Sequence, residues 1–181
     1  MIIGIIGKRG SGKTLTMAKE IAELVRKGRT VYTNFHISKE PFTKKQQERI
    51  KLVSDDFFKN YKDMKLYNCG VFLDEIYVYI DSRTSMSKRN KIMSYFFNQT
   101  RKRDVDLYYT TQFLHQVDRR LRSNTEMFIF PKLFKKKGSN DVWIRLNYML
   151  VGDNKQFKET YLGNNYFKYY KTDEIIDFGL E

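Results

Sequence analysis

The sequence contains one cysteine, two histidines and two prolines in 181 residues. A single thiol, Cys69, excludes a disulfide framework, and we expect it to be a small buried side chain. His36 and His115 are far apart and have no cysteine pairs beside them, so the pattern of a zinc site is lacking. No segment approaches the roughly 20 apolar residues of a membrane-spanning helix, and the first stretch, MIIGII, is too short for a signal peptide. We therefore expect a soluble, intracellular protein.

The chain also has no internal repeats and no linker rich in proline or glycine. With 15% aromatic and 41% hydrophobic residues, its composition is that of a folded domain. Lysine and arginine number 34 against 21 acidic residues, a formal charge of +13. Such an excess favours a nucleic acid, a membrane surface or another acidic partner. The alternative is a basic surface that is simply solvated.

A glycine-rich segment, GKRGSGKT at residues 7–14, matches the phosphate-loop (Walker A) pattern G-x-x-x-x-G-K-[ST]. The apolar run 2–6 before it predicts a buried strand, and the spacing of apolar residues after it predicts a helix that stops at Gly28. In this pattern the phosphates of a nucleotide are surrounded by backbone N–H groups, a helix N-terminus and the lysine. The threonine hydroxyl holds Mg²⁺. The predicted nucleotide-binding residues are Gly7, Lys8, Arg9, Gly10, Ser11, Gly12, Lys13 and Thr14.

A second apolar run, GVFLDEIYVYI at 70–80, predicts a strand that ends near Asp74. In phosphate-loop enzymes an aspartate at this place holds Mg²⁺, and Glu75 directly after it can activate a water for attack on the γ-phosphate. The alternative is a solvated strand end. A carboxylate that activates water favours hydrolysis over a kinase, which must keep water away from the γ-phosphate.

The remaining elements complete an alternating α/β pattern. We expect a strand at 29–35, one or two short helices near 46–53 and 57–61, a helix at 88–103, a strand at 105–112, a short helix or turn at 113–122 and a strand at 126–134. The alternating tail, with Gly163-Asn164-Asn165, predicts a pair or hairpin of strands, and KLFKKKGSN predicts a hairpin tip. These elements predict a single domain over 1–181: a mostly parallel sheet flanked by helices, with a core at about 1–130 and additional strands at about 126–181.

The strand at 105–112 ends in TTQ, where the Gln112 amide either contacts the γ-phosphate or caps the next helix. Over residues 2 to about 130 the sequence resembles the FtsK–HerA superfamily of DNA-pumping ATPases. The resemblance rests on the phosphate loop, on a strand whose three hydrophobic residues are followed by Asp-Glu, and on a strand that ends in [ST]-T-Q. Within this superfamily, DVDLYYTTQFLHQVDRRLR is most similar to the zonula-occludens-toxin-like branch and to small viral genome-packaging ATPases. The last 50 residues match only as a pattern of extra strands. The fold implied is a RecA-like, three-layer P-loop NTPase.

The resemblance also implies an arginine finger that acts on the γ-phosphate of a neighbouring subunit. In the superfamily this arginine lies eleven residues before the glutamine, which is the position of Arg101. The alternative for Arg101 is a surface charge at a helix C-terminus. Arg103 is the second candidate, followed by Arg119, Arg120 and Arg122.

The function implied is ATP hydrolysis with Mg²⁺ by a homo-oligomeric ring, with a hexamer as the expected size. The ring would translocate double-stranded DNA, as in packaging a viral genome, with capsid or portal-vertex proteins as further partners, in the host cytoplasm or on the virion. Alternatives are a toxin-like morphogenesis or secretion ATPase, a slow nucleotide-dependent DNA-binding switch and a small-molecule kinase. The sequence departs from the superfamily pattern in two ways. Asp104 stands where many members have glycine, so the turn before this strand is expected to differ. Filamentous-phage relatives carry a membrane-spanning helix, and this sequence shows no such segment, which argues against a role in membrane extrusion.

Several clusters of lysine and arginine are candidate DNA contacts. We expect the loop at 81–91 to be a pore loop, although a solvated charge run is the alternative. The clustered residues are Arg83, Lys88, Arg89 and Lys91; Arg101, Lys102 and Arg103; Arg119, Arg120 and Arg122; and Lys132 with Lys135, Lys136 and Lys137.

Overall fold

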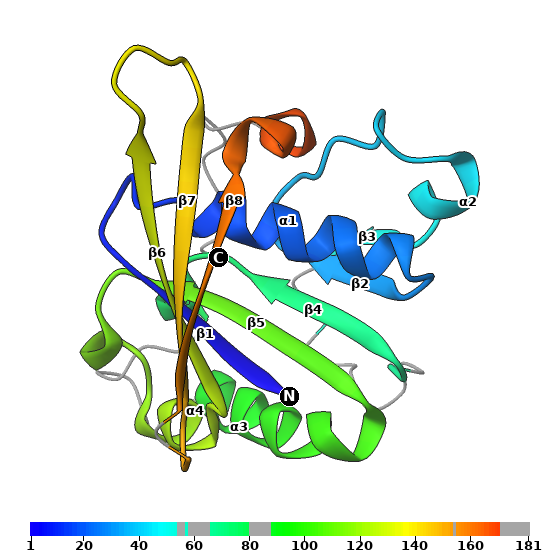
Figure 1. Ribbon diagram of the computed structural model, residues 1–181. Helices are drawn as coiled ribbons and strands as arrows, with labels where there is room; N and C mark the ends of the chain where they lie inside the picture. Colours follow the sequence, from blue (N-terminus) through cyan, green and yellow to red (C-terminus); the bar gives the residue numbers. More distant parts are fainter. Residues whose placement is uncertain (54–56, 58–65, 80–87, 154, 171–181) are drawn as a thin grey trace.

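The computed structural model describes residues 1–53, 57, 66–79, 88–153 and 155–170 (Figure 1). Strands and helices alternate along the first two thirds, and three long strands follow. In chain order the elements are β1 (Ile2–Ile6), α1 (Lys13–Arg26), β2 (Thr30–Thr33), α2 (Lys44–Gln47), β3 (Ile50–Leu52), β4 (Cys69–Leu73), η1 (Ile76–Val78), α3 (Lys88–Thr100), η3 (Arg101–Arg103), β5 (Val105–Thr111), η4 (Leu114–Gln116), α4 (Arg119–Asn124), β6 (Met127–Lys135), β7 (Val142–Leu150), β8 (Gln156–Leu162), η5 (Gly163–Asn165) and η6 (Phe167–Tyr169).

The strands form one sheet in the order β3-β2-β4-β5-β1-β6-β7-β8. The six strands from β3 to β6 run parallel, and β7 and β8 are antiparallel additions. Because β1, β4 and β5 point the same way, the segments that follow them meet at one edge of the sheet. That edge carries the glycine-rich loop, the Asp-Glu pair and Gln112. The predicted α/β class with a mostly parallel sheet is confirmed.

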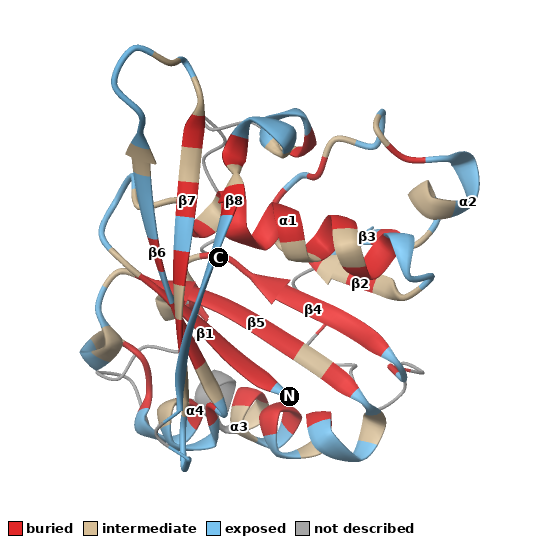
Figure 2. Ribbon diagram, viewed as in Figure 1, coloured by how far each residue is buried: buried red, intermediate tan, exposed pale blue. Residues whose placement is uncertain are grey.

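Apolar side chains from both faces of the sheet form the core. Ile3 and Ile5 pack with α1 on one face, whereas Ile2 and Val105 pack with α3 and α4 on the other. Figure 2 shows β1 and β4 buried along their whole length, as expected for parallel strands that are covered on both faces. Cys69 is buried, as predicted.

The antiparallel strands curve around α1 instead of extending the sheet flatly (Figure 1). The Thr16 hydroxyl of α1 lies 3.3 Å from the Tyr161 hydroxyl of β8. The Lys19 ammonium contacts Glu159 of β8 at 3.4 Å, along with Glu20 and Glu23 of its own helix. Burial on its own would lower the pKa of Lys19, but these carboxylates raise it. The helix that begins at the glycine-rich loop is therefore held on its outer side by the C-terminal strands.

Two local predictions differ from the structure. The helix expected near 46–53 is the single turn α2 followed by β3, because residues 50–52 pair in parallel with β2. The hairpin of the tail turns between β7 and β8, and Gly163-Asn164-Asn165 forms the short helix η5 after it.

Other expectations are confirmed or fall outside the described residues. The hairpin tip expected at KLFKKKGSN joins β6 and β7. Most of the second short helix (58–61) and the greater part of the predicted pore loop (81–87) lie outside the described residues. Among the described helices, none has the length and hydrophobicity to cross a bilayer.

Candidate nucleotide-binding site

The glycine-rich loop links β1 to α1 through backbone that glycine adopts most easily. Gly10 and Gly12 have φ values of 77° and 97°, in the left-handed region that other residues avoid. A Cβ added at Gly12 would lie 2.8 Å from Ile144 Cδ1, and one at Gly7 would lie 2.5 Å from Ser11 Oγ. The loop is thus held close to its own residues on one side and to β7 on the other.

Helix α1 begins at this loop without a side-chain cap and without an acidic residue in its first turn. Its first N–H groups and the positive end of its dipole remain available for an anion. Lys13 is 7% exposed, and its ammonium bends back to within 3.4 Å of the Lys8 carbonyl oxygen. The Ser11 hydroxyl is buried without a hydrogen-bond partner among the described atoms. Lys8, Arg9 and Gly10 are exposed at the tip. These donors suit phosphate oxygens.

The Asp74 side chain, which follows β4, joins the glycine-rich loop to the neighbouring strand β5. The Thr14 hydroxyl donates to its Oδ2 at 2.9 Å, and the Thr110 hydroxyl of β5 donates to its Oδ1. Asp74 is only 6% exposed, so its carboxylate is kept among donors. The hydroxyl and carboxylate predicted to hold Mg²⁺ therefore lie side by side. Oxygen ligands of this kind suit that ion.

Glu75 occupies a backbone conformation that is costly for a residue with a side chain. Its φ is 52°, in the left-handed region, and its N–H donates to Thr110 Oγ1 at 2.8 Å. The Asn34 amide, just after β2, holds the preceding residue: it accepts from the Asp74 N–H at 2.7 Å and donates to the Asp74 carbonyl at 2.9 Å. Three strand ends thus fix the turn that carries Glu75.

The Glu75 carboxylate has one oxygen, Oε2, that is buried with no hydrogen-bond partner among the described atoms. A buried carboxylate oxygen without a donor is costly, and a bound water would satisfy it. Burial, together with the charge of Glu75 and a hydrogen bond to its carboxylate, raises the pKa of the Tyr77 hydroxyl. Tyr77 thus stays protonated and donates to Glu75.

Gln112 and Arg101 lie at opposite ends of β5. Gln112 directly follows the strand, next to Thr111, whose carbonyl accepts from the Gly7 N–H at 3.3 Å. Arg101 precedes the strand in η3 and is exposed. Seven strand residues separate the two ends, a distance of about 20 Å. The structure therefore brings Gln112 to the glycine-rich loop and keeps Arg101 away from that loop.

The other candidate arginines are also remote from the loop. Arg103 lies over the Tyr67 ring at 5.8 Å, and Arg119 and Arg120 are exposed on α4, while Arg122 is half-buried there. Sequence reasoning did not single out Asn34, Tyr77 or Thr110. Asn34 lies near the end of the strand predicted at 29–35, and a polar residue near the end of a predicted strand is the signal that could have found the first of them.

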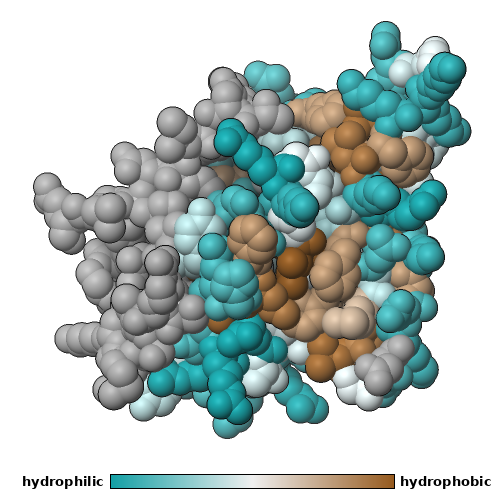
Figure 3. All heavy atoms as spheres, turned by 90° about the vertical axis from the view of Figure 1, so that its left-hand side faces the viewer, coloured by the Kyte–Doolittle hydropathy of each residue, from teal (hydrophilic) through white to brown (hydrophobic). Residues whose placement is uncertain are grey.

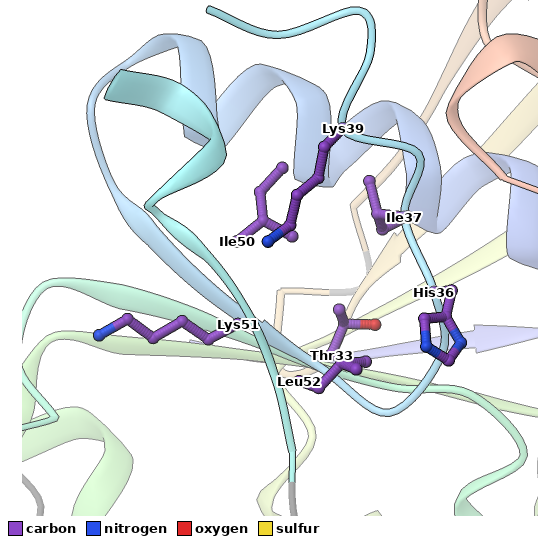
Figure 4. A pocket seen from close by; sticks show the side chains of 7 residues that line it. All are labelled: Thr33, His36, Ile37, Lys39, Ile50, Lys51 and Leu52. Atoms are coloured by element: carbon purple, nitrogen blue, oxygen red, sulfur yellow. The ribbon is translucent and has the colours of Figure 1, made fainter. Parts of the chain in front are cut away.

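A separate cavity of about 390 Å³ lies at the β2–β3 end of the same sheet edge (Figure 4). Ile37, Ile50 and Leu52 line it together with the stems of Lys39 and Lys51. Both β4 and β5 stand between β2 and β1, so this cavity is distinct from the glycine-rich loop.

Comparison with known proteins places the chain in a family. Residues 1–171 match the family described as Zonular occludens toxin (Zot). The chain belongs to this family. None of the curated proteins matches its sequence.

Solved structures share the fold of this Zot-family chain. The N-terminal domain of zonular occludens toxin from Neisseria meningitidis is 22% identical, with a TM-score of 0.62, over 94% of this chain and 98% of that one. B204, the DNA-packaging ATPase from Sulfolobus Turreted Icosahedral Virus, is 13% identical, with a TM-score of 0.63, over 87% and 96%. The genome packaging NTPase B204 from Sulfolobus turreted icosahedral virus 2, in complex with ATP-gammaS, is 14% identical with a TM-score of 0.61, over 87% and 96%. The predicted P-loop NTPase fold is confirmed.

Proposed function

We propose that this chain is a Mg²⁺-dependent ATPase that moves DNA. The observation that carries the ATPase proposal is the convergence of Thr14, Asp74 and Glu75 beside an uncapped helix N-terminus. In this proposal the loop backbone and Lys13 bind the phosphates. Thr14 and Asp74 hold Mg²⁺, which neutralises charge on the phosphates when bound.

Glu75 is the general base in this mechanism. Its buried Oε2 accepts a hydrogen bond from the attacking water and then takes a proton from it. Asn34 and Thr110 keep the carboxylate in position through the backbone turn, and Tyr77 donates a hydrogen bond to it. In this proposal the amide of Gln112, which follows β5 beside the glycine-rich loop, contacts the γ-phosphate. A base in this place favours hydrolysis over a small-molecule kinase.

The arginine that completes the site comes from a neighbouring subunit. Arg101 is exposed and lies at the far end of β5 from the glycine-rich loop, so it can act only on another copy. A homo-oligomeric ring, with a hexamer as the expected size, provides that arrangement. An arginine supplied in trans makes hydrolysis depend on assembly.

Double-stranded DNA is the proposed cargo, and packaging of a viral genome is the first candidate process. The charge of +13 supports a polyanionic partner, and the name of B204 records DNA packaging for a protein of the same fold. A morphogenesis or secretion ATPase is the second candidate, because the family match is to zonular occludens toxin. A slow DNA-binding switch would show little turnover.

The test is the ATPase rate of the purified, assembled protein with and without duplex DNA, together with its particle mass. A motor should accelerate several-fold with DNA, whereas a kinase should need a phosphate acceptor. Mixing Arg101→Ala subunits with Lys13→Ala subunits should restore part of the activity that each variant lacks. A monomeric particle that hydrolyses ATP at full rate would rule out the ring.

A further inference from the structure

Strands β6, β7 and β8, which pair antiparallel with one another, present two different faces. The pairing register of β6, β7 and β8 puts Ile144, Leu146 and Tyr161 toward α1. The alternate residues point to the opposite side, which we call the outer face. The outer face consists of Phe128, Phe130, Lys132 and Phe134 on β6, Trp143, Arg145, Asn147 and Met149 on β7, and Gln156, Lys158, Thr160 and Leu162 on β8.

The outer face combines aromatic rings with positive charge. Lys132, Arg145 and Lys158 are exposed on it, and Phe130 is 37% exposed. None of the residues of the outer face is acidic. Figure 3 looks at this side of the molecule and shows hydrophobic groups interspersed with hydrophilic ones. A solvated strand face alone needs no such rings, because each exposed one leaves apolar area in water.

Cations and rings are arranged in pairs near the β6–β7 tip. The Arg145 guanidinium lies 5.3 Å from the centre of the Phe134 ring, and the Lys136 ammonium lies 4.7 Å from the centre of the Trp143 ring. A face of this kind offers flat surfaces for stacking and cations for phosphates within a few residues.

The outer face and the glycine-rich loop lie on opposite sides of β7. Ile144, whose neighbours Trp143 and Arg145 lie on the outer face, packs against Gly12 of the glycine-rich loop. The exposed Arg119 and Arg120 of α4 precede β6 in the chain and lie on the same side of the sheet, since α3 and α4 cover the face opposite α1.

We propose that the outer face of β6–β8 binds single-stranded nucleic acid. The phosphates contact Lys132, Arg145 and Lys158, and unpaired bases stack on Phe130 and on the rings near the hairpin tip. This inference rests on the proposed function only in taking DNA as the partner.

Unpaired bases fit these rings better than a duplex does. In a duplex the bases are already stacked, so it would use the cations alone and ignore the rings. An anionic membrane would also be attracted by the cations, and it is an outcome of the test. A preference for single strands would move the function away from duplex packaging.

Trp143 provides a direct probe, because it is the only tryptophan in the chain. Titration of the assembled protein, without nucleotide, with an oligothymidylate of about 16 nucleotides should quench its fluorescence. A duplex of the same length should quench less. Neutralisation of three phosphates predicts that log K falls with log salt concentration with a slope of about −2.

Variants then test the residues by anisotropy of a labelled oligothymidylate. Phe130→Ala should weaken binding about tenfold, whereas Tyr95→Ala, which removes an exposed ring on α3, should not. Lys132→Ala should make the salt slope shallower by about 0.7, whereas the exposed Lys27→Ala should leave it unchanged.

The inference is overturned if Trp143 is not quenched, or if Phe130→Ala binds as tightly as the wild type. It is also overturned if vesicles of phosphatidylserine and phosphatidylcholine bind the outer face and single strands do not. The proposed function fails separately: quenching without DNA-stimulated ATPase keeps the inference and removes the motor. DNA-stimulated ATPase activity that Phe130→Ala leaves unchanged keeps the motor and removes the inference.

Discussion

The parallel strands β3, β2, β4, β5, β1 and β6 (the parallel half) and the antiparallel strands β7 and β8 (the antiparallel half) hold helix α1 in different ways. The parallel half brings the proposed catalytic groups to its N-terminus: the Thr14 and Thr110 hydroxyls donate to Asp74, and the Glu75 N–H donates to Thr110. The antiparallel half packs along its side through Ile144 and Tyr161. The geometry of the proposed site therefore depends on hydrogen bonds at one edge of the sheet. The position of the loop also depends on apolar packing from strands that carry none of the motif residues.

Replacing Glu75 with glutamine tests the chemical role of the parallel half. The amide keeps the shape of the side chain but cannot accept a proton, so we expect kcat to fall about 100-fold or more. Nucleotide affinity and thermal stability should stay near the wild-type values. Turnover measured by phosphate release, with the exposed Glu40→Gln as the charge-matched control, checks this. Normal turnover in Glu75→Gln would remove Glu75 from the mechanism.

The contact between Gly12 and Ile144 tests whether the two halves act together. Gly12→Ala places a side chain on left-handed backbone, which costs about 1–2 kcal/mol, and its Cβ would meet Ile144 Cδ1 at 2.8 Å. We expect ATP affinity to fall about tenfold or more, as measured by calorimetry.

Adding Ile144→Val to Gly12→Ala removes that Cδ1 atom and should recover part of the lost affinity. Ile144→Val alone should cost about 1 kcal/mol of stability and little affinity, which makes it the matched control. If the double variant binds ATP no better than Gly12→Ala, the backbone conformation explains the loss and β7 does not constrain the loop.

The contribution of the antiparallel half to stability should appear at alkaline pH. Burial raises the pKa of Tyr161, so the folded protein keeps this proton above pH 10 while the unfolded chain, with an ordinary pKa of about 10, loses it. The free energy of unfolding should then decrease as the pH rises above about 10.

Tyr161→Phe should reduce that decrease by up to about 1.4 kcal/mol per pH unit. At pH 7 the variant should lose about 1 kcal/mol, since the contact with Thr16 is gone. Urea unfolding at several pH values measures both effects. The exposed Tyr67→Phe is the control, and an equal pH dependence in Tyr161→Phe and the wild type would contradict this assignment.

The halves also differ in how far the sequence predicts them. Gly7–Thr14 and Asp74 stand in motifs whose spacing reflects the chemistry, so the parallel core and its edge could be predicted. Asn34 and Thr110 act on Asp74 only because β2 and β5 flank β4, and strand order is not visible in a local pattern. Residues 50–52 form a strand through pairing with β2, where tertiary contacts override local preference. The curvature of β7 and β8 over α1 likewise depends on distant partners.

Asp104, where the resemblance to the FtsK–HerA superfamily implies a glycine, tests the turn before β5. It has a φ of 51°, so the turn keeps the left-handed conformation that glycine adopts more easily. Asp104→Gly relieves this strain but adds freedom to the unfolded chain, and we expect a small net stabilisation of about 0.5 kcal/mol. Urea unfolding measures it, with Asp104→Ala as the control that keeps a Cβ and should not stabilise. Because this turn lies at the edge away from the glycine-rich loop, Asp104→Gly should leave nucleotide affinity unchanged, and a change in affinity would mean that the amino-terminal edge of the sheet also positions the site.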